Sequence, residues 1–229
     1  MTTDLLDLFC GAGGAAMGYH RAGFDVTGVD NVPQKHYPFE FIQADALEYL
    51  AEHGHEFDVI HASPPCQAHT ALRTMPNAKV HIDMIPSTRA LLRESGKLYV
   101  IENVPGAPLM GTFVLCGTMF GLHTTCGAEL WRHRYFETNW DIGLVPPCQH
   151  RENGGKVIGV YGGHGRDRQR VVTVTGNAGG SSHRDGTQQF STTERRIAMG
   201  IDWMTNAELS QAIPPAYTEF IGRQLRRAL

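Results

Sequence analysis

Short apolar runs alternate with amphipathic segments along the N-terminal half of this chain. The runs over residues 5–9, 25–29, 41–43, 57–61 and 97–101 predict buried β-strands. The periodicity over residues 15–22, 46–53 and 81–95 predicts helices, the last of which ends at Gly96. Strands that alternate with helices at this spacing are typical of an α/β fold with a doubly wound, mostly parallel sheet.

The pattern changes after Phe136. Residues 138–190 are rich in glycine, proline and arginine and contain short β-type runs such as 171–175. Helical periodicity returns at Thr192, and Pro214-Pro215 can open a closing helix that runs to Leu229. We therefore predict a main domain over 1–137, a small irregular, β-rich insert over 138–190, and a segment over 191–229 that returns to the main domain.

Composition narrows the class of protein. The 229 residues are 41% hydrophobic, which is enough for a globular core. No apolar run approaches the ~18–20 residues of a membrane span, and a predicted strand begins almost at Met1, so we expect no signal peptide and a location in the cell interior. The net charge of −3 means that any nucleic-acid-binding surface must be a local concentration of cations.

The five cysteines are an odd number with irregular spacing and no CxxC pair, which favours a reduced cytosolic protein over a disulfide framework. Cys126, Cys148 and His150 could join a metal site, but their spacing differs from that of zinc fingers. We therefore predict no metal.

The pentapeptide Ser63-Pro64-Pro65-Cys66-Gln67 follows an apolar run directly. Two adjacent prolines fix φ and remove two backbone donors. A thiol held in this way, at the carboxyl end of a predicted strand, lies where open α/β sheets bind ligands. Cys66 is therefore a candidate nucleophile, and a buried structural cysteine is the alternative.

A glycine-rich turn follows the first predicted strand. Gly11, Gly13 and Gly14 allow a tight turn and close approach of a ligand, and Asp30 ends the next strand, where a carboxylate can accept hydrogen bonds from ribose hydroxyls. The pattern predicts a nucleoside cofactor. It fits a relaxed dinucleotide fingerprint as well, and a purely structural turn is the other alternative.

Four motifs together resemble the DNA cytosine carbon-5 methyltransferase family. Residues 7–14 match Asp-Leu-Phe-x-Gly-x-Gly-Gly at every fixed position. Pro65-Cys66-Gln67, Glu102-Asn103-Val104 and Arg132-His133-Arg134 follow in the order of the family, and the resemblance extends from residue 4 to about residue 222. It implies a Rossmann-like methyltransferase fold, S-adenosyl-L-methionine as cofactor and double-stranded DNA as partner. We also expect the protein to be a monomer and to bind no membrane.

The chemistry gives each catalytic residue a role. Carbon 5 of cytosine becomes nucleophilic when a thiolate adds to carbon 6, which fits Cys66. This addition builds charge at ring nitrogen 3, where Glu102 can hold a proton if its pKa is raised. Arg134, with Arg132 beside it, can supply a cation near the base oxygen. A duplex cytosine must be flipped out to reach Cys66.

The resemblance also assigns the cofactor contacts. It places Phe9 against the adenine, Asp30 on the ribose, Asp45 on the adenine amino group, and the backbone of residues 11–14 on the amino-acid moiety. The full set implied to bind the cofactor is Phe9, Gly11, Ala12, Gly13, Gly14, Asp30, Asn31, Asp45, Ala46, Pro64, Gln211 and Ala212.

Target recognition is expected in the insert. Arg166, Arg168 and Arg170 alternate, so on a strand they would share one face and could contact phosphates. Arg184 and Gln67 complete the predicted DNA contacts, and residues 68–79 are expected to form a mobile lid. A solvated strand edge is the alternative for the arginines.

Three positions depart from the family pattern: Leu130 replaces a glutamine, Gln211 replaces an asparagine, and Glu194-Arg195-Arg196 replaces an Arg-Glu pair. The alternatives that stay open are transfer to tRNA, a different one-carbon donor because of Gln211, a nicotinamide-dependent oxidoreductase, and a non-catalytic nucleic-acid-binding relative.

Overall fold

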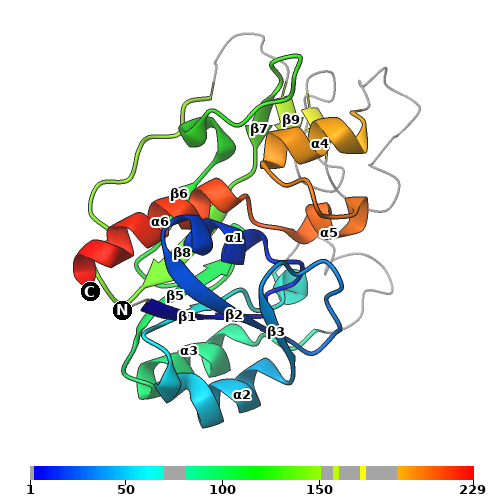
Figure 1. The fold of residues 1–229 in the computed structure, drawn as a ribbon. Helices are drawn as coiled ribbons and strands as arrows, with labels where there is room; N and C mark the ends of the chain where they lie inside the picture. The colour runs from blue at the N-terminus through cyan, green and yellow to red at the C-terminus, as the bar shows by residue number, and fades with distance from the viewer. Residues whose placement is uncertain (1–2, 70–80, 151–156, 160–170, 174–189) are drawn as a thin grey trace.

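The chain folds around a mixed sheet with helices on both faces (Figure 1). The computed structural model describes residues 3–69, 81–150, 157–159, 171–173 and 190–229. Within this described part, seven strands are hydrogen-bonded in the order β3-β2-β1-β4-β5-β8-β6. They are β1 (Thr3–Leu8), β2 (Phe24–Asp30), β3 (Glu40–Gln43), β4 (Val59–Ala62), β5 (Leu98–Asn103), β6 (Phe113–Leu115) and β8 (Arg134–Thr138).

The first five strands are parallel, and β8 runs antiparallel to both β5 and β6. Two helices, α1 (Gly14–Arg21) and α6 (Pro215–Ala228), cover one face of the sheet, and α2 (Ala46–His53) and α3 (Ile85–Glu94) cover the other (Figure 1). Each face has its own apolar core, built around Tyr19 and Tyr217 on one side and Leu50 and Leu92 on the other. The predicted doubly wound, mostly parallel sheet is confirmed.

Helices α1 and α6 approach so closely that only glycine fits at their crossing. A methyl group on Gly18 would lie 2.0 Å from the Thr218 Oγ1 atom and 2.2 Å from the Pro215 carbonyl oxygen. Pro215 is the first residue of α6, as expected for a proline with no backbone N–H to donate. Helix α6 is therefore packed directly against α1, the helix that follows the glycine-rich turn.

Several predicted boundaries differ from those of the structure, and two of these differences have a clear physical cause. The helix expected over 81–95 begins only at Ile85, because the Asp83 carboxylate accepts a hydrogen bond from the Ile85 N–H and turns the chain into the helix. The strand expected over 97–101 continues through Asn103, which places Glu102 inside β5 rather than after it. The register of β5 and β8, with Glu102 opposite Phe136, maintains this extension.

A second, smaller sheet has the strand order β10-β9-β7 within the described residues, all of it parallel. It contains β7 (Glu129–Trp131), β9 (Val157–Gly159) and β10 (Val171–Thr173). Helices α4 (Thr192–Met199) and α5 (Asn206–Gln211) follow, with α4 close to β7 (Figure 1). The insert thus joins the main domain through β7, which precedes residue 138; the predicted domain limits stay a prediction.

No helix in the described ranges has the length and apolar character that crossing a lipid bilayer requires.

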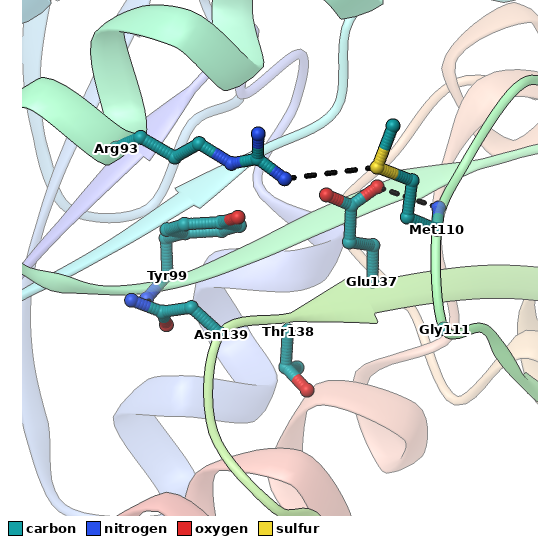
Figure 2. Close-up of a pocket in the computed structure, with 7 residues that line it drawn as sticks. All are labelled: Arg93, Tyr99, Met110, Gly111, Glu137, Thr138 and Asn139. Atoms are coloured by element: carbon teal, nitrogen blue, oxygen red, sulfur yellow. Dashed lines mark hydrogen bonds between the residues drawn. The ribbon is translucent and has the colours of Figure 1, made fainter.

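A cavity of about 380 Å³ opens beside Glu137, near the start of β5 and the end of β8 (Figure 2). Glu137 is almost fully buried and accepts two 2.7 Å hydrogen bonds from the Arg89 guanidinium and one of 2.8 Å from the Met110 N–H. The cavity contains none of the motif residues and lies at the opposite end of β5 from Glu102. Glu137, a polar residue of its lining, is held in a structural ion pair between α3 and the sheet.

Replacing Glu137 with alanine should destabilise the protein by about 3–5 kcal/mol, because the Arg89 charge would stay buried without its partner. Urea denaturation of the purified protein measures this loss. Glu219→Ala is the matched control, since the Glu219–Arg223 pair is exposed on α6 and should contribute at most about 1 kcal/mol. Equal losses for the two variants would contradict the structural role of the buried pair.

Candidate active site

The two best-defined sequence motifs meet where the strand order of the sheet reverses. From β1 the chain proceeds outward to β2 and β3, whereas β4 and β5 lie on the other side of β1. Ligands of open α/β sheets bind at the carboxyl ends of strands at such a point. Leu8 lies opposite Ala62, and the Ser63 N–H donates to the Leu8 carbonyl oxygen over 3.1 Å. The glycine-rich turn and the Pro-Pro-Cys loop are therefore neighbours.

The turn after β1 is held open by unusual backbone angles. Phe9 has φ of 56°, the single positive φ of a non-glycine residue in the described chain, and Gly11 has φ of 49°. The Asp30 carboxylate accepts hydrogen bonds from the Gly11 N–H and the Val32 N–H, both over 3.0 Å. A methyl group on Gly11 would find no other atom within 4 Å, so open space faces the turn.

This turn fits a nucleoside cofactor. A carboxylate offers about four acceptor sites, so Asp30 can orient the turn and still accept from a ribose. Gly14 begins α1, whose N-terminal N–H groups can face an anionic group. Asp45 caps α2 through one oxygen, which accepts from the Leu47 and Glu48 N–H groups, and its second oxygen takes no part in the cap.

The remaining predicted cofactor residues lie around the same edge. Gly14 packs so tightly against the closing segment that an added methyl would meet the Ile213 carbonyl oxygen at 2.4 Å and the Ala212 side chain at 3.3 Å. Gln211 is the exposed last residue of α5. The other predicted members are Asn31, which follows β2, Ala46, which opens α2, and Pro64, which precedes the cysteine loop.

Cys66, Glu102 and Arg134 come from three different elements. Cys66 begins the 3₁₀ turn η2 (Cys66–Ala68), Glu102 lies near the end of β5, and Arg134 starts β8. Arg134 Nε lies 2.9 Å from Glu102 Oε1, and both side chains are only 8% exposed. The Asn103 amide donates to the Pro64 carbonyl oxygen over 2.9 Å and so holds the cysteine loop against β5.

The electrostatics of the site follow from burial and from its two arginines. Burial raises the pKa of the Glu102 carboxyl, while Arg134 and Arg132 oppose this shift. Burial also raises the pKa of the Cys66 thiol, the Glu102 charge raises it further, and Arg134 lowers it. Burial therefore shifts Glu102 toward its protonated form while the two arginines favour the carboxylate, and thiolate formation at Cys66 depends on the arginines.

A buried chain of polar side chains behind Glu102 was missed by the sequence reasoning. The Tyr19 hydroxyl lies 2.9 Å from His61 Nδ1, and His61 Nε2 lies 2.9 Å from the Ser63 hydroxyl. The Ser63 hydroxyl in turn hydrogen-bonds Glu102. Burial lowers the pKa of His61 to about 3, so the imidazole is neutral and acts as a hydrogen-bonding link. Only the tertiary fold brings Tyr19 to this position.

Trp203 is a second missed residue. Its indole N–H donates to the Ala12 carbonyl oxygen over 2.9 Å, across a sequence separation of 191 residues. Nothing in the local sequence indicates this contact. It ties the glycine-rich turn to the segment between α4 and α5.

Arg132 is too deeply buried to contact a substrate that enters from solvent. It is fully buried, donates through Nη2 to the Ser210 carbonyl oxygen over 3.0 Å, and its own carbonyl accepts from the Tyr217 hydroxyl. These bonds join the turn before β8 to the segment that carries Gln211. Arg132 thus adds positive charge to the site and positions its neighbours.

Two departures from the family pattern have structural explanations. Leu130 is fully buried and packs in a core with Ala198 and Met199, where an amide would need hydrogen-bond partners. Glu194 accepts a 2.8 Å hydrogen bond from the Thr125 N–H and so ties α4 to the strand region.

The predicted DNA contacts are only partly covered. Gln67 is exposed, next to Cys66 in η2. Arg166, Arg168, Arg170, Arg184 and residues 70–79 of the predicted lid lie outside the described residues.

Comparison with known proteins identifies relatives by sequence. The chain is 31% identical over 114 residues to the Type II methyltransferase M.FnuDI of Fusobacterium nucleatum, and 29% identical over 122 residues to M.XorII of Xanthomonas oryzae pv. oryzae. Each match covers 44% of this chain but only 32% and 28% of the relatives, so the chain aligns with about a third of their length. No family model matches.

Solved structures share the whole fold. A prophage-encoded E. coli protein described as a DNA modification methyltransferase matches with a TM-score of 0.59 at 14% identity, over 99% of both chains. The S. pombe Dnmt2 methyltransferase matches with a TM-score of 0.60 at 13% identity, over 100% of this chain and 99% of its own. The predicted Rossmann-like methyltransferase fold is thus confirmed, and the two relatives found by sequence are themselves Type II methyltransferases.

The pH at which Cys66 becomes reactive should shift in opposite directions in two variants. Glu102→Gln removes the charge that raises the Cys66 pKa, so alkylation by iodoacetamide should reach half its maximum rate at lower pH than in the wild type. Arg134→Met removes a charge that lowers this pKa and should shift the midpoint to higher pH.

Peptide mass spectrometry resolves Cys66 from the other cysteines in this experiment. Exposed Cys126 is the internal control, and its alkylation profile should be the same in all three proteins. Shifts of the same sign in both variants would contradict the proposed coupling of the three side chains.

Proposed function

We propose that this chain transfers a methyl group from S-adenosyl-L-methionine to carbon 5 of cytosine in double-stranded DNA. The observation that carries the proposal is the meeting of Cys66, Glu102 and Arg134 beside a glycine-rich turn held by Asp30. A nicotinamide-dependent oxidoreductase would use the turn but would leave these three side chains without a role. The Type II methyltransferase relatives support DNA as the substrate.

In the proposed mechanism the Cys66 thiolate adds to carbon 6 of a flipped cytosine and forms a carbon–sulfur bond. Glu102 donates its proton to ring nitrogen 3, so that the ring does not carry the charge of the addition. Carbon 5 then has the electron density to act as a nucleophile. Loss of the carbon 5 proton to water after transfer restores the ring double bond and expels the Cys66 thiolate, and ring nitrogen 3 returns its proton to Glu102.

Arg134 has two roles in this scheme. Its guanidinium lowers the pKa of Cys66, which increases the thiolate fraction, and it stabilises negative charge near the base oxygen during the addition. Its ion pair with Glu102 also opposes the rise in the pKa of that carboxyl. The protonation of Glu102 is therefore set by the balance between burial and Arg134.

S-adenosyl-L-methionine supplies the electrophilic methyl group when bound. Asp30 would accept from its ribose, Phe9 and Asp45 would contact the adenine, and the turn over residues 11–14 would receive its amino-acid moiety. The open space at Gly11 and the second oxygen of Asp45 are compatible with these roles.

Replacing Cys66 with serine should reduce methyl transfer to below about one-thousandth of the wild-type rate, since a serine hydroxyl is a far weaker nucleophile at neutral pH. Transfer is measured with radiolabelled S-adenosyl-L-methionine and duplex DNA of mixed sequence. Binding of the cofactor, measured by calorimetry, should be unchanged because Cys66 does not belong to the glycine-rich turn.

A second readout tests the covalent step. DNA that contains 5-fluorocytosine should trap the wild-type protein as a complex stable to denaturant, because carbon 5 then has no proton to lose. Cys66→Ser should form none. Retained transfer by Cys66→Ser would refute the nucleophile, and a product base heavier by more than one methyl group would refute the proposed donor.

Duplex DNA should be the better substrate in direct comparison with transfer RNA, with kcat/KM at least about tenfold higher. Both are assayed at the same salt concentration, because phosphate contacts make nucleic-acid affinity strongly dependent on salt. Higher kcat/KM on transfer RNA would assign the same chemistry to an RNA substrate.

A further inference from the structure

Four potential metal ligands converge at the junction between the main sheet and the smaller sheet. Cys116 follows β6, His133 lies between β7 and β8, and Cys148 and His150 end the described segment that precedes residue 151. One ligand atom from each of these residues lies within 4.8 Å of every other. The group is separate from the catalytic residues, and the proposed function assigns it no role.

Two sulfur–nitrogen distances in this cluster are close to those of tetrahedral coordination. Cys116 Sγ lies 3.3 Å from His150 Nε2, and Cys148 Sγ lies 3.5 Å from His133 Nε2. A zinc ion with usual Zn–S and Zn–N bond lengths and tetrahedral angles requires sulfur–nitrogen separations of about 3.5 Å. The two imidazoles are at 80° to each other, so both can direct Nε2 toward one point.

The groups around the cluster resemble the outer shell of a metal site. The Thr118 hydroxyl lies 3.5 Å from the sulfur of Cys116 and 3.5 Å from that of Cys148. The Trp131 ring stacks on His150 with a centroid separation of 4.0 Å and fixes the orientation of that imidazole. Second-sphere groups of this kind orient the ligand atoms of metal sites.

We propose that Cys116, His133, Cys148 and His150 bind one structural zinc ion. Two thiolates and two imidazoles are the donor set that zinc prefers, and four protein ligands leave no position for a substrate. The ion would fasten the end of β6, the turn between β7 and β8, and the chain that enters the insert to one another. The sequence prediction of no metal would then be wrong.

The sequence analysis identified two of these four ligands but grouped them with the wrong cysteine. Cys148 and His150 were considered as ligands together with Cys126. In the structure Cys126 contacts the Thr124 hydroxyl over 3.3 Å and takes no part in the four-residue cluster. Cys116 and His133 replace it, and their separation along the chain hides them from a search for finger-like spacing.

Metal analysis of the purified 229-residue chain tests the site. Protein from zinc-supplemented cultures, dialysed against metal-free buffer with a thiol reductant, should contain about one zinc per chain by plasma mass spectrometry. Cys148→Ser and His150→Ala should lose most of it. Cys126→Ser is the matched control and should keep one zinc, and His150→Cys should keep it as well because a thiolate restores the fourth ligand.

Thermal unfolding separates metal binding from misfolding. A strong chelator should lower the Tm of the wild type and of Cys126→Ser but leave the Tm of Cys148→Ser unchanged. A folded wild type with far less than one zinc per chain would overturn the proposal, as would full zinc content in Cys148→Ser. A Cys116–Cys148 disulfide in peptide maps of the reduced protein would also overturn it. None of these readouts requires methyl transfer, so the zinc site and the enzymatic activity can fail independently.

Discussion

The parallel pairing of β1 with β4 is the constraint on which the geometry of the site depends. It places Leu8 opposite Ala62, so the two loops that follow these strands must emerge side by side. The helices that follow, α1 and α3, cover opposite faces of the sheet (Figure 1), and the crevice between the loops is left uncovered by either. The glycine-rich turn and the Pro-Pro-Cys loop are thus brought together by backbone hydrogen bonding alone, before any side chain of the site is considered.

The charged side chains of the site then determine which chemical steps this crevice can support. Glu102 and Arg134 are both buried, so neither has bulk water to solvate its charge, and each depends on the other. The chain from Tyr19 through His61 and Ser63 supplies further hydrogen bonds to Glu102 without adding a charge, because His61 is neutral at physiological pH. A carboxyl in this setting can hold or release a proton when a neighbouring group changes its charge, as the addition of a thiolate to a cytosine ring would require.

Local sequence carried the information for the five parallel strands, the glycine-rich turn and the candidates Cys66, Glu102 and Arg134, because hydrophobic period and motif order are local properties. Contacts between residues far apart in the chain could not be predicted from local sequence. The Trp203 bond to Ala12 and the Tyr19 bond to His61 join segments that only the folded chain brings together. The start of α3 at Ile85 was missed for a different reason, since the carboxylate of Asp83 overrides a periodic pattern that continues upstream. The sequence shows that Leu130 and Glu194 depart from the family pattern. The structural role of each residue became clear only from the residues that it contacts in the folded chain.

The position of Arg134 links the site to the rest of the molecule. His133 lies between Arg132 and Arg134, and it is also one of the four clustered residues that we propose as zinc ligands. Arg132 is fixed by Ser210 and Tyr217 on its other side, so this tripeptide is held by the closing segment and by the cluster at once. A residue in such a position cannot move without disturbing the pairing of Arg134 with Glu102. Ordering the chain at Cys148 and His150, in the first part of the predicted insert, would therefore fix the base of the insert and the cationic side of the active site through the same backbone.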